Sequence, residues 1–163
     1  MMNDVKQIEM DRMRFTKNKS SANLVLLAIV LDVLYFVSLY KSDVGNYYYN
    51  ILIGASIIYN LIFLLAAFLA SEAVKSRRSG FTVPLIVLGL IQFGRIFIIP
   101  FQAHSAMVSM SGAIVPVMGD AQFIAIVIFL VGSGACCIAA AVTSHLKNKA
   151  LTEYMKTIAQ PNA

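Results

Sequence analysis

Two residues of opposite charge, Asp32 and Arg95, lie inside long apolar stretches of the chain. Arg95 belongs to the segment 82–101 (TVPLIVLGLIQFGRIFIIPF), which has the length and the apolar character of a membrane-spanning helix. An ionised side chain at the centre of such a helix costs about 3 kcal/mol unless it is paired, hydrated or able to reach the membrane surface. Asp32 lies near the middle of the first apolar stretch and is the obvious partner. The sequence therefore predicts a buried ion pair.

Other polar residues are expected at the same depth as this pair. Asp32 lies about 10 residues into a helix expected at 22–40, and Arg95 about 13 residues into one expected at 82–101, a difference in depth of roughly 5 Å. A residue three positions away on the same helix shares a face with either charge. The other two apolar segments each carry a polar residue near their middle. The predicted intramembrane polar layer consists of Asp32, Tyr35, Asn60, Gln92, Arg95 and Ser133.

The polar layer allows two main interpretations. In the structural one, it fixes the order and register of the helices, as buried polar residues do in some proteins. In the functional one, Asp32 is a proton or cation site and Arg95 is its gate or counter-charge, as intramembrane ionisable residues often are in transporters. A further alternative places Arg95 against a water-filled cavity or a partner subunit.

The elements that must position these residues follow from composition. Of the 163 residues, 59% are hydrophobic and only 13% are charged, and the mean hydropathy is +0.76. Soluble domains are about half apolar and a quarter charged. We therefore expect one all-α membrane domain with four transmembrane helices at about 22–40, 47–70, 82–101 and 121–144.

The rest of the chain divides around this domain. The sequence predicts an N-terminal segment at 1–19, a four-helix transmembrane domain at 20–145 and an amphipathic C-terminal tail at 146–163. Ser20 and Ser21 are candidate caps of the first helix. Eleven of the 13 Lys and Arg residues flank the expected helices on one side, whereas the loops of the other side contain only Lys41. Basic residues favour cytoplasmic loops, so both termini are expected in the cytoplasm of a cell with this protein in its plasma membrane. The N-terminal segment is expected to form an amphipathic helix on the membrane surface or a solvated tail, and the amphipathic C-terminal tail to lie on the membrane surface or against a partner.

Two further segments suggest contacts. The fourth apolar stretch contains Gly132, Ser133 and Gly134, and small residues let helices approach closely in lipid, so Gly132 and Gly134 are predicted to pack against another helix. The outer segment 102–119 is unusually apolar for a loop. It is expected to lie along the outer surface, to dip into the protein or to bind a partner.

Several function classes lack their motifs. The basic residues flank apolar segments instead of forming one solvated face, so no nucleic-acid partner is expected. Cys136 and Cys137 are adjacent, and neighbouring side chains of a helix diverge, so they predict neither a disulfide nor a metal pair. His104 with Asp120 offers at most a weak metal or proton site. We expect no catalytic residues, no bound metal and no cofactor.

These observations lead to two hypotheses for function. The first is a small, non-enzymatic integral membrane protein that serves as a subunit or assembly partner of a larger membrane complex, such as a transporter. The alternative is a self-assembling small transporter or channel that uses Asp32 and Arg95 as an intramembrane proton or ion site. The partners expected are the lipid bilayer and either another membrane protein or further copies of the chain. The Lys- and Ile-rich composition, without an organellar presequence, suggests a bacterial source.

Overall fold

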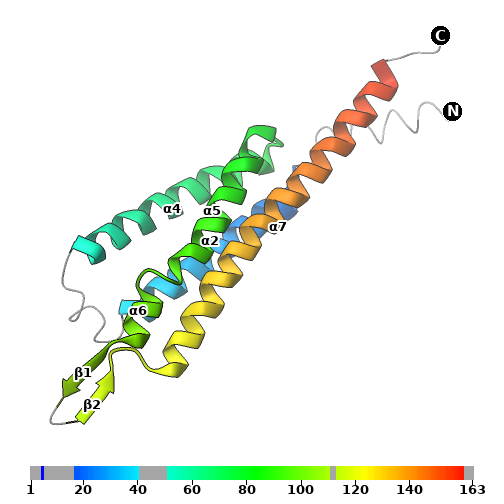
Figure 1. Ribbon diagram of the computed structural model, residues 1–163. Coiled ribbons are helices and arrows are strands. Elements are labelled where there is room, and N and C mark those ends of the chain that lie inside the picture. The colour runs from blue at the N-terminus through cyan, green and yellow to red at the C-terminus, as the bar shows by residue number, and fades with distance from the viewer. Residues whose placement is uncertain (1–4, 6–16, 41–50, 111–112, 160–163) are drawn as a thin grey trace.

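The protein is a bundle of long helices with a small hairpin at one end (Figure 1). A computed structural model describes residues 5, 17–40, 51–110 and 113–159 of the chain. Four of the described helical stretches are long and apolar enough to cross a membrane: Lys19–Tyr40, Ile53–Lys75, Ser79–Ser105 and Asp120–Lys156. The chain is therefore an all-α protein with the composition of a multi-pass membrane protein. Its elements are α2 (Lys19–Tyr40), α4 (Ile51–Lys75), η1 (Ser79–Phe81), α5 (Thr82–Arg95), α6 (Pro100–Ser105), β1 (Met107–Met110), β2 (Ala113–Pro116) and α7 (Asp120–Ala159).

The first helix begins before the serines that the sequence suggested as its cap. Asn18 precedes the first residue of α2, and its Oδ1 accepts a hydrogen bond of 3.4 Å from the backbone N–H of Ser21. Its Nδ2 donates to Ser21 Oγ at 2.8 Å. Asn is among the best residues at this position because its side chain satisfies an otherwise unpaired donor of the first turn. Asn18, not Ser20 or Ser21, is the cap.

The second helix is longer at its C-terminal end than predicted. The expected start at 47–50 lies outside the described residues, but α4 continues past residue 70 to Lys75. Glu72 and Lys75 form an exposed ion pair of 2.7 Å within this extension. The helix ends where Arg77 adopts a positive φ of 58°, and the N–H of Arg78 donates to the carbonyl of Ala73 at 3.0 Å. A left-handed residue with this hydrogen bond is a common helix terminator.

The third predicted helix, 82–101, is interrupted in the structure. Helix α5 ends at Arg95, and the next residues form tighter turns in which Ile98 N–H donates to Arg95 O at 3.2 Å. Helix α6 then starts at Pro100. Proline has no N–H to donate to the carbonyl of the residue four positions earlier, and its ring clashes with that carbonyl in a regular helix. Pro100 therefore explains why the regular helix stops early and restarts at the proline itself.

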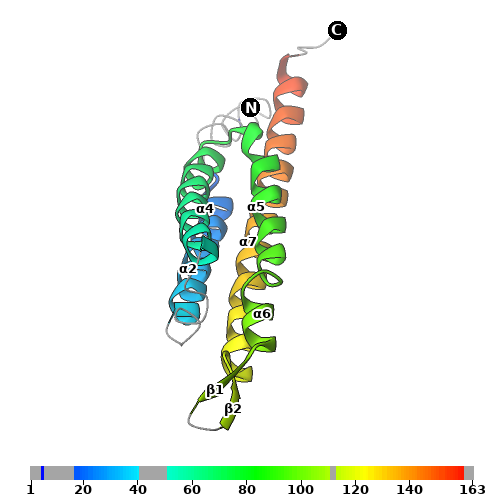
Figure 2. The same ribbon diagram turned by 60° about the vertical axis from the view of Figure 1, so that its left-hand side comes forward.

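The fourth helix shows the largest difference from the prediction of a helix at 121–144 and a separate tail. Helix α7 runs without a break from Asp120 to Ala159, which is 40 residues. At 1.5 Å of rise per residue it is about 60 Å long, roughly twice the hydrocarbon thickness of a bilayer. No Gly or Pro follows Gly134 within the helix, so nothing in the sequence ends it. Its C-terminal part projects beyond the other helices (Figures 1 and 2).

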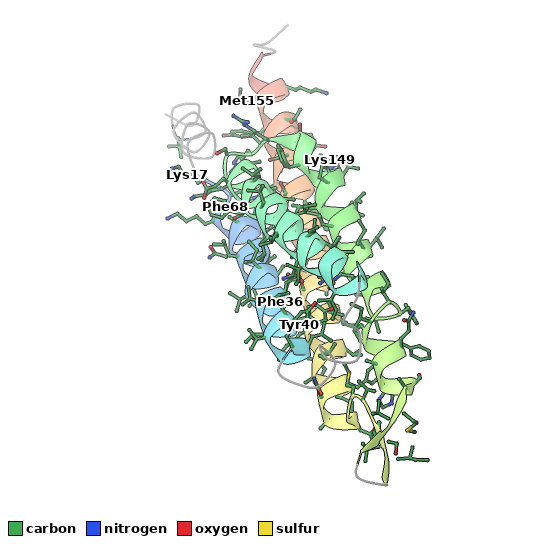
Figure 3. All side chains as sticks on the ribbon, turned by 90° about the vertical axis from the view of Figure 1, so that its left-hand side faces the viewer. Lys17, Phe36, Tyr40, Phe68, Lys149 and Met155 are labelled. Carbon is green, nitrogen blue, oxygen red and sulfur yellow. The ribbon has the colours of Figure 1, made fainter. Side chains whose placement is uncertain are left out.

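The amphipathic face predicted for the tail lies on this projecting part of α7. Leu151 and Tyr154 are half-buried and Met155 is exposed. The prediction for the N-terminal segment falls mostly outside the described residues. Figure 3 shows Lys17, Lys149 and Met155 toward the end of the bundle from which α7 projects, whereas Phe36 and Tyr40 lie nearer the other end.

Helix α7 is the helix around which the bundle is assembled. It packs along both α2 and α5, and α4 packs mainly on α2 while it touches α5 only lightly. Two apolar clusters fill the interior. One contains Phe63, Leu85 and Ala140, and the other, nearer the hairpin, contains Leu39, Ile99 and Leu130. Much of the outer surface is also apolar, with Leu61 62% exposed, as expected for helices that face lipid.

Helices α5 and α7 approach each other closely at a pair of glycines. A Cβ atom on Gly89 would lie 2.8 Å from the backbone oxygen of Gly134, and one on Gly134 would lie 2.8 Å from the oxygen of Gly89. Both helices therefore depend on the missing side chains. At Gly132, by contrast, a Cβ would meet only the end of the Leu31 side chain, at 3.0 Å. Of the two glycines predicted from the sequence, Gly134 makes the close crossing and Gly132 makes a softer contact with α2.

The described residues of the segment 102–119 form helix, strand and a short link to α7. After α6, strands β1 and β2 pair as an antiparallel hairpin with Met107 opposite Pro116 and Met110 opposite Ala113. Met118, just before α7, is fully buried. The hairpin itself extends past the bundle (Figure 2).

Candidate functional site: a buried ion pair shared by the helices

The ion pair joins α2 to α5 in the interior of the bundle. Arg95 Nη1 lies 2.6 Å from Asp32 Oδ1. The side chain of Asp32 is fully buried, and that of Arg95 is 6% exposed. Removing two charges from water is costly, and the attraction between them offsets this cost only when geometry is good and further hydrogen bonds are made. The additional partners of both residues therefore decide how the pair is held.

Gln92 links the pair to α7. It lies one turn before Arg95 on α5, where its Oε1 accepts a hydrogen bond of 2.8 Å from Arg95 Nη1. Its Nε2 donates to Asp32 Oδ1 at 2.9 Å and to Ser133 Oγ at 3.3 Å. Ser133 in turn donates to the carbonyl oxygen of Ala28 at 2.9 Å. The amide thus bridges both charges and the fourth helix.

Helix α4 supplies a third side of the site. Asn60 Oδ1 accepts a hydrogen bond of 2.8 Å from Arg95 Nη2. The Arg95 guanidinium also lies over two aromatic rings, with Cζ 4.5 Å from the centre of Tyr35 and 4.6 Å from the centre of Tyr59. Such contacts stabilise a cation by about 2 kcal/mol where water is excluded. The guanidinium is therefore held by hydrogen bonds at its edge and by aromatic rings at its faces.

The six residues of the predicted polar layer meet in this one network. The two apolar clusters lie on either side of it along the helices, so the network forms a polar layer across an otherwise apolar interior. Sequence reasoning missed Tyr59 as a member of the site, although it precedes Asn60 directly. It also missed Gly89, whose contact with Gly134 sets the distance between α5 and α7 near Gln92 and Ser133. A small residue one turn before Gln92 was the available signal for the second.

Part of the hydrogen-bonding capacity of the layer is unused. Asp32 Oδ2 and the hydroxyl of Tyr59 are buried and have no hydrogen-bond partner in the part of the chain that the structure describes. A cavity of about 300 Å³ lies beside the layer between α4 and α5. Its wall includes Arg95 and Ser56 together with apolar side chains such as Ile91. Helices α4 and α5 pack against each other only lightly, so the cavity lies along a loosely packed contact between helices.

Other chemistry-bearing residues do not form a comparable site. His104 Nε2 lies 3.9 Å from Asp120 Oδ1, and the imidazole stacks on Phe123 at 4.4 Å between ring centres. Asp120 is 88% exposed at its side chain, so this contact is weak. Among residues 17–40, 51–110 and 113–159, no three His, Cys, Asp or Glu side chains gather as metal ligands.

The fold and the site together define a class: a helical protein with four potential membrane spans and a buried ion pair at their centre. Comparison of the chain with protein-family models, with curated proteins and with solved structures finds no match. The function must therefore be argued from the geometry of the chain itself.

Proposed function

We propose that the protein is a non-enzymatic membrane protein that works as a small subunit or assembly partner of a larger membrane complex, such as a transporter. The observation that carries this proposal is the number of contacts that hold the Arg95 guanidinium inside the bundle. Three hydrogen bonds and two aromatic rings hold it, and its partners come from α2, α4 and its own helix. Charges held in this way stabilise one arrangement of helices.

The energetics of the pair favour this structural role. Breaking a buried pair by removing one partner costs about 3 to 5 kcal/mol because the remaining charge is left uncompensated. A mobile gate would have to lose the contacts with Asp32, Asn60 and both tyrosines during each cycle. The layer therefore fixes the order and register of the helices, and binding to the larger complex is left to the surface of the protein.

The proposal includes an orientation and a location. Helix α4 ends, and α7 projects, at the same end of the bundle (Figure 1). The basic residues at this end are Lys75 at the last position of α4, Arg77 and Arg78 directly after it, and Lys147 and Lys149 in the C-terminal part of α7. The positive-inside rule assigns that side to the cytoplasm, which leaves the hairpin on the outer side. We propose a bacterial plasma membrane as the location, with both termini in the cytoplasm.

Purification from the membranes of the source organism in a mild detergent tests this function. A tagged chain expressed at its native level should elute with a different membrane protein in a fixed ratio. A preparation containing only copies of this chain, with undiminished yield and stability, would overturn the subunit proposal. The control is an unrelated tagged four-span protein expressed at the same level, which should not retain the same partner.

A second candidate function rests on the unused acceptor. Asp32 Oδ2 is buried without a partner in the described part of the chain, and the cavity of about 300 Å³ lies against Arg95. These features favour a proton or ion site in a self-assembling transporter or channel. The double variant Asp32→Asn, Arg95→Gln separates the two functions. A folded double variant with a normal cell phenotype supports the subunit, and a folded variant that has lost transport supports the transporter.

A further inference from the structure

The hairpin exposes an uncharged face at the end of the bundle. Cross-strand partners and alternate residues share a face, which places Met107, Ser109, Ile114 and Pro116 together. All four are exposed, including Met107 at 63% and Ile114 at 76%. The hairpin continues the long axis of the bundle beyond α6 (Figures 1 and 2).

Neither lipid nor water suits this hairpin as its only environment. A two-stranded sheet has two open edges, and unpaired backbone groups do not occur in contact with the hydrocarbon of a bilayer. In water, an isolated two-stranded hairpin is marginally stable at best, and exposed apolar edge strands associate with other chains. No Lys, Arg, Asp or Glu occurs between Ile96 and Gly119 to oppose such association. A protein that binds here can pair with the backbone groups of the open edge and can cover the exposed apolar side chains.

The register of the hairpin shows which edge is able to accept a strand. Val117 N–H donates to Ala106 O at 3.0 Å, which identifies these opposite residues as a hydrogen-bonded pair. Antiparallel ladders alternate between hydrogen-bonded and non-hydrogen-bonded pairs. The pair of Met107 with Pro116 and the pair of Ser109 with Ile114 are therefore non-hydrogen-bonded pairs.

Residues of non-hydrogen-bonded pairs direct their backbone groups outward, to the open edges. On β1, both Met107 and Ser109 offer an N–H and a carbonyl oxygen there. On β2, Ile114 offers both groups, but Pro116 has no N–H. Proline at such a position is a known device that blunts a sheet edge. The edge of β1 is therefore complete, and the edge of β2 is not.

A second copy of the chain does not fit this edge. Copies inserted the same way into one membrane are related by rotation about the membrane normal, and strands that follow this direction then pair in parallel. Hydrogen bonds in a parallel pair slant to the residues before and after the opposite one. When a two-fold axis relates two β1 edges, each residue lies opposite the same residue of the other copy, and both direct their backbone groups at each other. A parallel pair instead requires an offset of one residue between the bonding residues of the two strands. Pairing β1 with β2 of the next copy lacks the hydrogen bond that an N–H at position 116 would donate.

We propose that the edge of β1 (Met107–Met110), which pairs with no other strand among the described residues, accepts an extended strand of a different protein on the outer side of the membrane. This inference rests on the proposed function and names the element through which the subunit binds its partner. The added strand hydrogen-bonds with the backbone of Met107 and Ser109, and its alternate side chains cover the exposed face that includes Ile114. Recognition of this kind takes its affinity from main-chain bonds and its specificity from alternate side chains.

Proline substitution at one edge tests the proposal. Ser109→Pro removes an outward N–H of β1 and no hydrogen bond within the hairpin. The amount of partner that purifies with the tagged variant should therefore fall by a factor of about ten or more, and a factor of ten corresponds to 1.4 kcal/mol. Ser109→Ala keeps the N–H and should retain the partner. Ile114→Pro makes the same change on the β2 edge and should retain as much partner as Ile114→Ala. An unchanged melting temperature identifies variants that are folded.

The outcomes distinguish this inference from the proposed function. If Ser109→Pro is folded and still retains the partner, the strand site is wrong and the subunit function stands. If the purified protein holds only its own copies, both are wrong.

Photocrosslinking in native membranes provides the second measurement, with a benzophenone amino acid at Met107 and a control at lipid-facing Leu61, which is 62% exposed. An adduct with a different protein at Met107 alone supports the site. Adducts only with lipid, or only with a second copy, overturn it.

Discussion

Arg95 Nη1 and Asp32 Oδ1 are 2.6 Å apart at a position where both side chains are almost entirely removed from solvent. The two residues are 63 positions apart in the sequence and belong to helices that α7 holds together. This contact joins α5 to α2. The amide of Gln92, also on α5, bonds to both residues and to Ser133, which extends the connection to α7. The stability of the bundle should therefore depend on the pair as a unit.

The first prediction is that Asp32 and Arg95 are energetically coupled. Asp32→Asn and Arg95→Gln should each destabilise the protein by about 3 to 5 kcal/mol, because each leaves the buried charge of the other residue uncompensated. The double variant should recover much of this loss. Unfolding in detergent, followed by circular dichroism, gives the four free energies of the cycle. Additive losses would show that the pair does not interact, since residues in contact normally couple.

The second prediction concerns the ring of Tyr59. Tyr59→Leu should lower the free energy of unfolding by about 0.5 to 2 kcal/mol, because it removes an aromatic face from the Arg95 guanidinium. Tyr59→Phe keeps the ring and removes a buried hydroxyl that has no partner among the described residues, so it should match or exceed the parent. The same unfolding assay compares both variants. A larger loss for Phe than for Leu would show that the hydroxyl, not the ring, is the important group.

The third prediction compares two glycines of α5. Gly89→Ala places a Cβ 2.8 Å from the backbone of Gly134 and should cost about 1 to 3 kcal/mol, as overpacking does. Gly94→Ala meets no atom within 4 Å and should stabilise the helix by about 0.5 to 1 kcal/mol. Melting temperatures in detergent measure both effects. Equal behaviour of the two variants would contradict the close crossing of α5 and α7.

The fourth prediction tests the proposed orientation with two engineered cysteines. Ser109→Cys, in the hairpin, should react with a membrane-impermeant thiol reagent in intact cells. Ser76→Cys, after α4, should react only once the cells are permeabilised, because the basic residues beside it favour the cytoplasm. The parent chain, whose Cys136 and Cys137 lie within α7, provides the background. Labelling of the Ser76→Cys variant alone in intact cells would reverse the orientation.

The relation of the β-hairpin to the sequence illustrates why local patterns leave alternatives open. The apolar character of 102–119 allowed a surface segment, a segment inside the protein or a binding element. In the structure, Met118 of this segment is buried and Ile114 is exposed, so the segment does not lie in one environment, and its apolar character alone could not show this. Which strand edge offers a full set of backbone groups depended on the register of the two strands, which only the structure showed.

The sequence by itself determined the four apolar helices and the depth of their polar residues, because a buried backbone in lipid must satisfy its own hydrogen bonds and hydropathy is a local property of each segment. It also placed Asp32 and Arg95 at similar depths. Only the tertiary structure decided which faces meet: that Tyr59 stacks on Arg95, that Gly89 opposes Gly134, and that the seam between α4 and α5 is loosely packed. Rotation of one helix against another depends on how all side chains interlock at once, and no single segment encodes it.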